Sequence, residues 1–229
     1  MSDEHTSDAD AASLQLARDV RAELAHCLNS LGGKESKGAF DKFLFYSASQ
    51  MNKAAEAFIA LREVGRVDAS KLLVRPLIEM MFRTCAVANK PALLYRIILT
   101  ERLKRNKWIK NAATRQQTEY DAKEEARQWE VFRQHCVAMV PETDLTNKDL
   151  SVRHVAEAAN MVGYYEGFYA MYCTYVHGSF EAIMGLLDPL SDAYDNRTAA
   201  LTIFSAVEVL RGLGGESPNF ESLRKRLQL

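Results

Sequence analysis

Apolar residues recur every three or four positions along almost the whole chain, a spacing that places them on one face of an α-helix. The first such stretch runs from about Ala11 to Leu31, and its apolar positions are Leu14, Leu16, Val20, Leu24, Cys27, Leu28 and Leu31. The strict alternation of apolar and polar residues that is typical of a half-buried strand is almost absent. The pattern therefore predicts an all-α fold.

Glycine, proline and helix-capping residues divide this pattern into about seven or eight predicted helices. After the first helix they cover approximately residues 40–64, 69–88, 91–138 with a break near 111–115, 150–177, 179–187, 197–213 and 220–227. No linker separates two domains, so residues 11–229 are predicted to form a single multi-helix bundle. Residues 1–10 are acidic and polar, and we expect a disordered tail there.

Composition narrows the class of protein. The chain has 229 residues, of which 48% are hydrophobic, enough for a sizeable core, and its formal net charge is -1, which gives no general argument for a nucleic-acid partner. The four cysteines are far apart in sequence and are expected to be reduced, and the polar N-terminus is unlike a signal peptide. These features predict a cytoplasmic protein.

The segment from Met161 to Leu187 is the one stretch apolar enough to compare with a membrane span. It contains Glu166 and Glu181, and five tyrosines and four glycines interrupt it. A span needs about twenty predominantly apolar residues without carboxylates in mid-run. We therefore expect buried helices and no membrane contact.

The predicted helix around residues 72–88 is apolar over most of its circumference, which is typical of a central helix. Arg75, Glu79 and Arg83 nevertheless occupy one row of it at spacings of four residues. This spacing allows Glu79 to pair with either arginine. The row is either a solvated ladder of ion pairs or a charged cluster that lines a cleft.

A second unusual segment carries tyrosines at helical spacing and ends at His177, immediately before Gly178. Such tyrosines usually pack in a core and direct their hydroxyl groups at polar partners. Tyr172 and Tyr175 are candidates for ligand contact. His177 either caps the helix or serves as a proton donor or acceptor at a cleft, because the imidazole pKa lies naturally near neutrality.

Together, the segments Leu73–Glu79 and Tyr172–Ser179 resemble an uncharacterised, all-helical bacterial family of unknown function. Its members carry an Arg-x-x-x-Glu helix and a later helix with a pattern like Tyr-x-x-x-Ser-x-x-x-His-Gly. Here Cys173 or Thr174 stands near the expected serine. The resemblance covers roughly residues 40–190 and implies that Arg75, Glu79 and His177 meet in space, but it implies no reaction.

Other kinds of chemistry have little support in the sequence. HEPN ribonucleases use an arginine four to six residues before a histidine, and the positions that precede His177 at this spacing are Ala170, Met171 and Tyr172. Only one Glu-x-x-His pair occurs, Glu23 with His26, whereas di-iron bundles need two. No phosphate-binding loop or nucleophile elbow is present. We expect no metal and no cofactor.

Two features bear on partners. A basic run occupies residues 96–115 and acidic residues follow it, so the two halves are expected to neutralise each other or a partner subunit. Nucleic-acid contact through this run is possible but is not favoured. Gly163 and Gly167, four residues apart among aromatic residues, permit close helix approach, and we predict a homo-oligomer.

Two functional hypotheses follow. The favoured one is an interaction or small-ligand, anion-binding bundle with Arg75, Glu79, His177 and Tyr172 clustered in its core, and with Arg83 and Tyr175 as further candidates for ligand contact. The alternative is a metal-independent, nuclease-like effector of the bacterial defence or toxin type. In it His177 is the acid or base, Arg75 stabilises a phosphate oxyanion and Glu79 orients Arg75. An open cleft bordered by the basic run would favour the nuclease.

Overall fold

A computed structural model describes residues 3–32, 38–116, 121–139, 150–177 and 192–229, and every regular element in these ranges is a helix. The long helices are α1 (Asp3–Leu31), α2 (Ala39–Glu63), α3 (Val67–Asn89), α4 (Leu93–Gln116), α5 (Ala122–Met139) and α10 (Asp192–Gly212). The short ones are α6 (Val152–Ala158), α7 (Val162–Tyr164), the π-helix η1 (Tyr165–Tyr169), α8 (Ala170–Val176) and α11 (Phe220–Leu227). The predicted all-α, multi-helix fold is confirmed.

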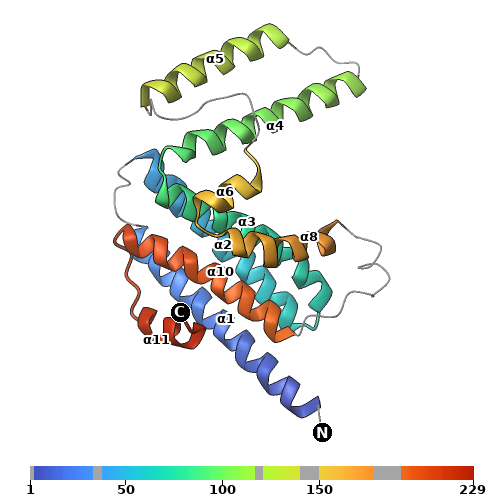
Figure 1. Ribbon diagram of the computed structural model, residues 1–229, viewed down its shortest axis with the longest axis vertical. Helices are drawn as coiled ribbons and strands as arrows, with labels where there is room; N and C mark the ends of the chain where they lie inside the picture. Colours follow the sequence, from blue (N-terminus) through green and yellow to red (C-terminus); the bar gives the residue numbers. More distant parts are fainter. Residues whose placement is uncertain (1–2, 33–37, 117–120, 140–149, 178–191) are drawn as a thin grey trace.

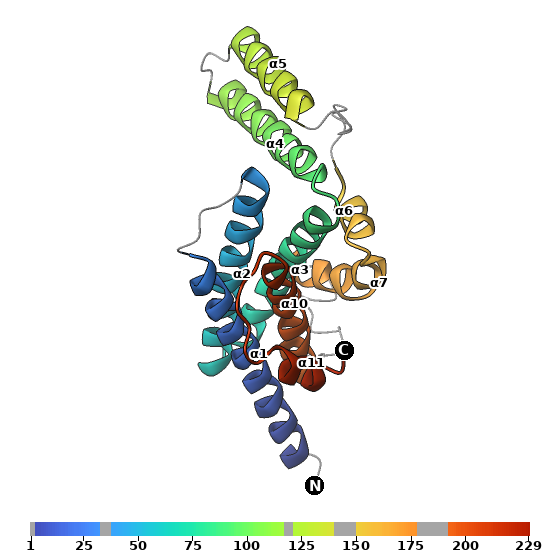
Figure 2. The ribbon, with the colours of Figure 1, turned by 90° about the vertical axis from the view of Figure 1, so that its left-hand side faces the viewer.

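The core lies between α1, α2, α3 and α10, which pack side by side, while α6 to α8 cross the outer side of α3 (Figures 1 and 2). Its largest fully buried side chains include Leu24, Met51, Phe58, Ile78, Phe82 and Phe204. Val74, Ala86 and Val87 lie about 100–140° from one another around α3 and are all buried, because neighbours cover the helix on several sides. The prediction that this helix is central is confirmed.

The turn between α2 and α3 follows from one glycine. Gly65 has a φ of 71°, in the left-handed region that glycine adopts without strain. Its backbone N–H donates to the Arg62 carbonyl at 3.1 Å, and that of Arg66 donates to the Leu61 carbonyl at 2.8 Å. These bonds satisfy the last carbonyls of α2, as in a glycine-terminated helix.

The N-terminal helix is longer than the apolar pattern indicates. It begins at Asp3, whereas we expected a disordered tail over residues 1–10 and a helix start near Ala11. A contact between helices explains part of the extension, since Asp10 Oδ1 accepts a hydrogen bond of 2.6 Å from the backbone N–H of Ala193 at the start of α10. Ser13 donates back to the Asp10 carbonyl at 2.8 Å.

Helices α4 and α5 run antiparallel and stand out from the bundle (Figure 1). We expected the break between them near residues 111–115, but α4 continues to Gln116 and α5 begins at Ala122. Asp121 starts α5, because its Oδ1 accepts hydrogen bonds from the backbone N–H groups of Lys123 and Glu124, both at 3.0 Å. A small apolar cluster holds the pair together: Leu99, Cys136, Tyr95, Leu103, Trp129 and Phe132.

The segment expected as one helix over residues 150–177 is interrupted twice. Asn160 has a φ of 59° and ends α6, since asparagine tolerates the left-handed conformation better than most residues. The π-helical turn η1 then precedes α8 and changes the angular position of the residues after it. The helix expected at 179–187 lies outside the described residues.

Across the described ranges, no helix combines the length and the apolar character that crossing a membrane requires.

Candidate functional site

The row of charged residues on α3 forms the base of the site. Arg75 Nε donates to Glu79 Oε1 at 3.1 Å, one helical turn further along, as the spacing predicts. The side chains of Arg75 and Glu79 are 19% and 25% exposed, so both are largely, but not fully, withdrawn from water. The pair therefore lies at the edge of the bundle.

His177 reaches this pair from the C-terminal end of α8. Its Nε2 lies 2.8 Å from Arg75 Nη1. Because a guanidinium can only donate, Nε2 is the acceptor in this contact. The structure thus brings Arg75, Glu79 and His177 together in space, as the resemblance implies, while His177 itself is exposed.

Tyr169, in the π-helical turn, completes the group and was not among the predicted site residues. Its hydroxyl donates to Glu79 Oε1 at 2.8 Å and accepts from Arg75 Nη2 at 3.4 Å, and the guanidinium carbon of Arg75 lies 5.5 Å from the ring centroid. One signal could have found it. The pattern Tyr-x-x-x-Ser-x-x-x-His-Gly, counted back from His177, gives Cys173 and then Tyr169.

The four residues Arg75, Glu79, Tyr169 and His177 are called the Arg75 cluster below. Burial and the Glu79 carboxylate together raise the pKa of the Tyr169 hydroxyl far above its usual range, so it stays protonated and donates. Burial opposes the charge of Arg75, but the hydrogen bond to Tyr169 and the negative charges nearby outweigh it and raise the pKa of the guanidinium. The cluster therefore holds a fixed cation beside the imidazole of His177.

A family model described as a family of unknown function (DUF5677) matches residues 41–194, about two thirds of the chain. The chain belongs to this family. No curated protein and no solved structure matches it. The matched range includes all four residues of the Arg75 cluster, and the family assignment brings no reaction or ligand with it.

Tyr172, which we predicted to join the Arg75 cluster, lies elsewhere in this family member. It is fully buried, and its hydroxyl donates to Asp195 Oδ1 of α10 at 2.5 Å. Tyr169 and Tyr172 are three positions apart and lie about 60° from each other around the helix, but their hydroxyl groups have different partners: Tyr169 contacts Arg75 and Glu79 of α3, and Tyr172 contacts Asp195 of α10. The prediction for Tyr172 was wrong: Tyr169 faces Arg75, and Tyr172 faces the core.

Asp195 is the centre of a second, buried group. Its Oδ2 lies 2.7 Å from Arg62 Nη2 and 3.9 Å from Lys71 Nζ, and Arg62 Nη1 also lies 2.7 Å from Oδ1 of Asp192. Burial raises the pKa of the Asp195 carboxyl, against the hydrogen bond from Tyr172 and the charges of Arg62 and Lys71. We call Arg62, Lys71, Tyr172 and Asp195 the Asp195 cluster.

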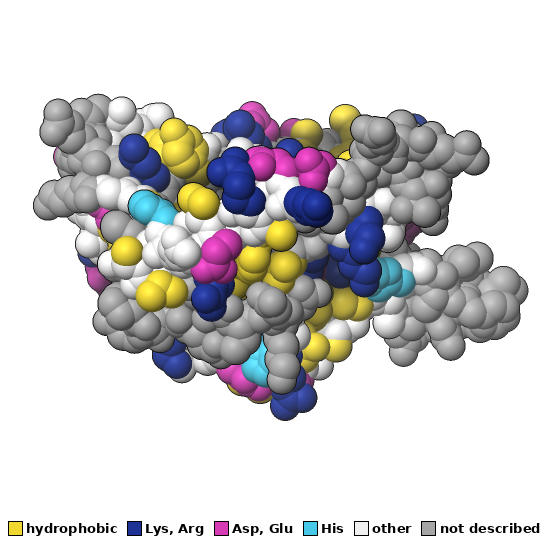
Figure 3. Space-filling model, turned by 90° about the horizontal axis from the view of Figure 1, so that it is seen from above, with side chains coloured by type: hydrophobic (Ala, Val, Ile, Leu, Met, Phe, Trp, Pro, Cys, Tyr) yellow, Lys and Arg dark blue, Asp and Glu magenta, His cyan; other side chains and the backbone are white. Residues whose placement is uncertain are grey.

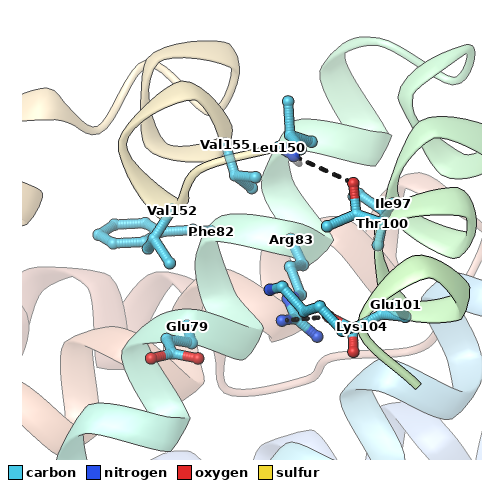
Figure 4. A pocket seen from close by; sticks show the side chains of 10 residues that line it. All are labelled: Glu79, Phe82, Arg83, Ile97, Thr100, Glu101, Lys104, Leu150, Val152 and Val155. Atoms are coloured by element: carbon cyan, nitrogen blue, oxygen red, sulfur yellow. Dashed lines mark hydrogen bonds and ion pairs between the residues drawn. The ribbon is translucent and has the colours of Figure 1, made fainter. Parts of the chain in front are cut away.

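The two remaining candidates for ligand contact are not brought into the Arg75 cluster. Tyr175 is half-buried, and Lys71 Nζ lies 5.4 Å from its ring centroid, so it borders the Asp195 cluster. Arg83 donates to Glu101 Oε1 of α4 at 2.8 Å. Arg83 and Glu79 both line a small pocket between α3, α4 and the start of α6, with Lys104 on its far side (Figure 4).

That pocket holds about 20 Å³, room for roughly one water molecule. Its apolar lining includes Phe82, Ile97, Leu150 and Val155. A ligand larger than water does not fit there, so the exposed edge formed by Arg75 and His177 is the more accessible part of the site. Within the described ranges, no three His, Cys, Asp or Glu side chains are arranged as metal ligands.

Proposed function

We propose that the Arg75 cluster binds a small anion, a phosphate or a carboxylate, at the exposed edge where Arg75 and His177 meet. The observation that supports this most directly is the 2.8 Å contact between Arg75 Nη1 and His177 Nε2. The other two nitrogens of the same guanidinium, Nε and Nη2, already donate to Glu79 and Tyr169. An arginine that is fixed by two partners, and whose remaining nitrogen faces an exposed imidazole that an anion can displace, is suited to charge-assisted binding of an oxyanion.

Each member of the Arg75 cluster has a role in this proposal. Glu79 and Tyr169 hold Nε and Nη2, so the guanidinium loses little side-chain freedom when an anion arrives. The anion replaces His177 Nε2 as the acceptor of the Nη1 hydrogen. The imidazole is then free to take up a proton on Nε2 and to become a second donor to the same anion.

The test is a titration of the full chain with inorganic phosphate, pyrophosphate and acetate, followed by calorimetry and by the NMR signals of the histidine ring protons. We expect saturable binding, with the largest shift at His177. Arg75→Lys and His177→Gln should each weaken it by about tenfold or more, equivalent to at least about 1.4 kcal/mol.

A matched control is available for the histidine. His154 is also exposed, and among the described residues its ring bonds to Ser151 alone, at 2.8 Å, so His154→Gln makes the same chemical change away from the cluster. It should leave anion binding unchanged. Absence of saturable binding, or equal losses in the His154 and His177 variants, would refute the proposal.

The nuclease-like alternative keeps one supporting observation: His177 is exposed and contacts an arginine, the pairing that acid–base chemistry beside a phosphate needs. In that reaction a neutral His177 accepts the proton of the attacking hydroxyl while Arg75 faces the phosphate oxygens. A labelled RNA incubated with the protein in EDTA separates the two functions. Cleavage that His177→Gln abolishes and His154→Gln retains would replace the binding proposal with the nuclease.

A further inference from the structure

Helix α4 is far more basic than the chain to which it belongs. It carries seven Lys or Arg residues and one acidic residue, Glu101, whereas the formal net charge of the whole chain is -1. The positive charge is thus concentrated on one helix that stands out from the bundle with α5 (Figure 1). Such segregation is the electrostatic signature of a polyanion-binding surface.

The glutamates Glu124, Glu125 and Glu130 of α5 form their described contacts without an ion pair to this helix. Glu124 accepts from Arg127 and Gln128, and Glu130 accepts from Arg133 and Gln134, all on α5 itself. Glu125 pairs with the amide of Asn106. No ion pair joins these α5 residues to α4, so these contacts do not provide the expected mutual neutralisation of the basic run and the acidic residues after it.

Glu101, the acidic residue of α4, is also engaged elsewhere. It could pair with Lys104 or Arg105 by helical spacing, but its Oε1 accepts from Arg83 of α3 at 2.8 Å. Lys104, Arg105 and Lys107 are exposed, and the described residues supply none of them with an ion-pair partner. Their charges are available to an outside partner.

An exposed aromatic ring lies among these charges. Trp108 is 71% exposed, the highest value among the large hydrophobic residues of the described chain. At about 100° per residue it lies on the same side of α4 as Lys104, with Lys107 and Arg105 at the borders of that side. We call Lys104, Arg105, Lys107 and Trp108 the α4 basic face.

The surroundings fit an elongated ligand. A groove of about 620 Å³ between α4 and α5 is lined by Arg102, Arg105, Asn106 and Gln128, together with Glu101, Glu125 and two isoleucines. Hydrogen-bond donors therefore continue from the basic face toward α5, among acidic and apolar side chains. From above, where α5 and α4 lie nearest the viewer, Lys and Arg side chains are interspersed with hydrophobic and acidic ones (Figure 3). A chain of phosphates with separate bases matches such a mixed surface better than a single compact anion does.

We propose that the α4 basic face binds single-stranded nucleic acid, with Lys104, Arg105 and Lys107 at phosphates and a base stacked on Trp108. Stacking on an exposed aromatic needs an unpaired base, which is why the strand is single, and it tolerates any base because every base has a π-face. The proposal is independent of anion binding at the Arg75 cluster, because the residues and the helix differ.

The experiment measures fluorescence anisotropy of labelled oligouridylate and oligothymidylate with the full chain across a salt series. Three phosphate contacts on a single strand predict a slope of log affinity against log salt of about −2. Lys104→Gln with Lys107→Gln should weaken binding at low salt and reduce that slope to about −0.7. Comparison of the two oligonucleotides distinguishes RNA from DNA.

Trp108→Leu separates stacking from charge. Loss of one stacked base should weaken binding by about 5- to 150-fold while the salt slope stays as in the parent. The control is Lys53→Gln with Lys225→Gln, which removes the same charge from exposed lysines of α2 and α11. It should bind as the parent does.

Several outcomes would overturn the proposal. One is that the parent protein, shown to be folded by its melting curve, binds neither oligonucleotide at low salt. A second is an equal loss in the control lysine variant, which would mean that only net charge matters. A third is an unchanged affinity in Trp108→Leu together with equal binding of anionic lipid vesicles, which would make the α4 basic face a general polyanion surface.

Discussion

Arg75 and His177 lie 2.8 Å apart, Nη1 to Nε2, although they are 102 positions apart in sequence. Packing of α8 on α3 brings them together, and the rings of Phe82 and Tyr169, 6.0 Å apart between centroids, form part of that contact. The sequence hypothesis distinguished a sealed cluster from an open cleft. The Arg75 cluster lies between the two, because its ion pair is mostly covered and its histidine is exposed.

The partial burial of the Arg75–Glu79 pair sets its expected effect on stability. Glu79→Ala leaves Arg75 and the Tyr169 hydroxyl without their shared acceptor, yet water can reach both. We expect the free energy of unfolding to fall by about 1–2 kcal/mol, more than for an exposed pair and less than for a buried one. Urea denaturation of variant and parent measures the difference.

Arg153 and Glu157 supply the matched control, since they form an i,i+4 pair at 3.2 Å with side chains 57% and 45% exposed. Glu157→Ala should cost less than about 0.5 kcal/mol. Equal losses in the two variants would mean that the burial of the Arg75 cluster contributes nothing, and its role would then be purely one of binding.

Helix ends that depend on nearby residues were predictable. Gly65 follows the end of α2, and Phe220–Leu227 forms α11, both as the sequence indicates. A glycine in the left-handed conformation ends a helix, and a short apolar repeat defines one, through residues within one or two turns. The central position of α3 was also predictable, since a helix apolar nearly all round must be covered on most sides.

Tyr169 was missed although regular spacing favours it over Tyr172. Counted back from His177, Tyr169 lies about two helical turns away, whereas Tyr172 lies about 140° away around the helix. Several tyrosines at helical spacing in this segment could each have faced Arg75, and the breaks at Asn160 and at the π-helical turn come no later than Tyr169, so they do not change this relationship. The Asp195 cluster was missed for a different reason. Arg62, Lys71 and Asp195 lie on three different helices, and in the sequence alone each resembles an ordinary surface charge.

The Asp195 cluster should contribute more to stability than the Arg75 cluster does. Asp195 is fully buried and holds Arg62, Lys71 and Tyr172. Asp195→Ala leaves Lys71 without its carboxylate and Arg62 with Asp192 alone. It should lower the free energy of unfolding by about 3–5 kcal/mol, a large part of a typical total of about 5–15 kcal/mol.

Two further variants make the Asp195 prediction specific. Tyr172→Phe removes one hydrogen bond to a charged group and should cost about 1.5–3 kcal/mol. Asp192→Ala removes the half-exposed carboxylate on the other side of Arg62 and should cost about 1 kcal/mol or less. If thermal melting showed Asp195→Ala to be no worse than Asp192→Ala, the buried charges would not be coupled as the geometry indicates.

A pH-dependent contribution is expected where α1 meets the segment before α11. Glu23 is 3% exposed; its Oε1 accepts from Ser217 Oγ at 2.6 Å and from the Asn219 backbone at 2.9 Å, and its Oε2 accepts from the Asn219 side chain at 3.1 Å. Burial opposes ionisation, but these hydrogen bonds outweigh it and lower the pKa of Glu23.

The sign of the effect follows from that direction. A carboxyl with a lowered pKa in the folded state stabilises the fold above its unfolded pKa of about 4.3, and this contribution is lost as the pH falls through the folded value. Glu23→Gln keeps the shape but not the charge. At pH 7 it should cost about 1.5–3 kcal/mol, or about 3–12 °C in melting temperature.

Melting curves of the parent and Glu23→Gln at neutral pH and near pH 3 isolate this residue, because all other carboxyl groups titrate in both proteins. The difference in melting temperature should narrow as the pH falls, since protonated Glu23 and glutamine are then both neutral. Glu56→Gln serves as the control, because Glu56 is 63% exposed and should show little difference at either pH. A gap for Glu23→Gln that stays constant from neutral to acidic pH would show that Glu23 acts through its shape and neutral hydrogen bonds, and that its charge does not hold the C-terminal segment on α1.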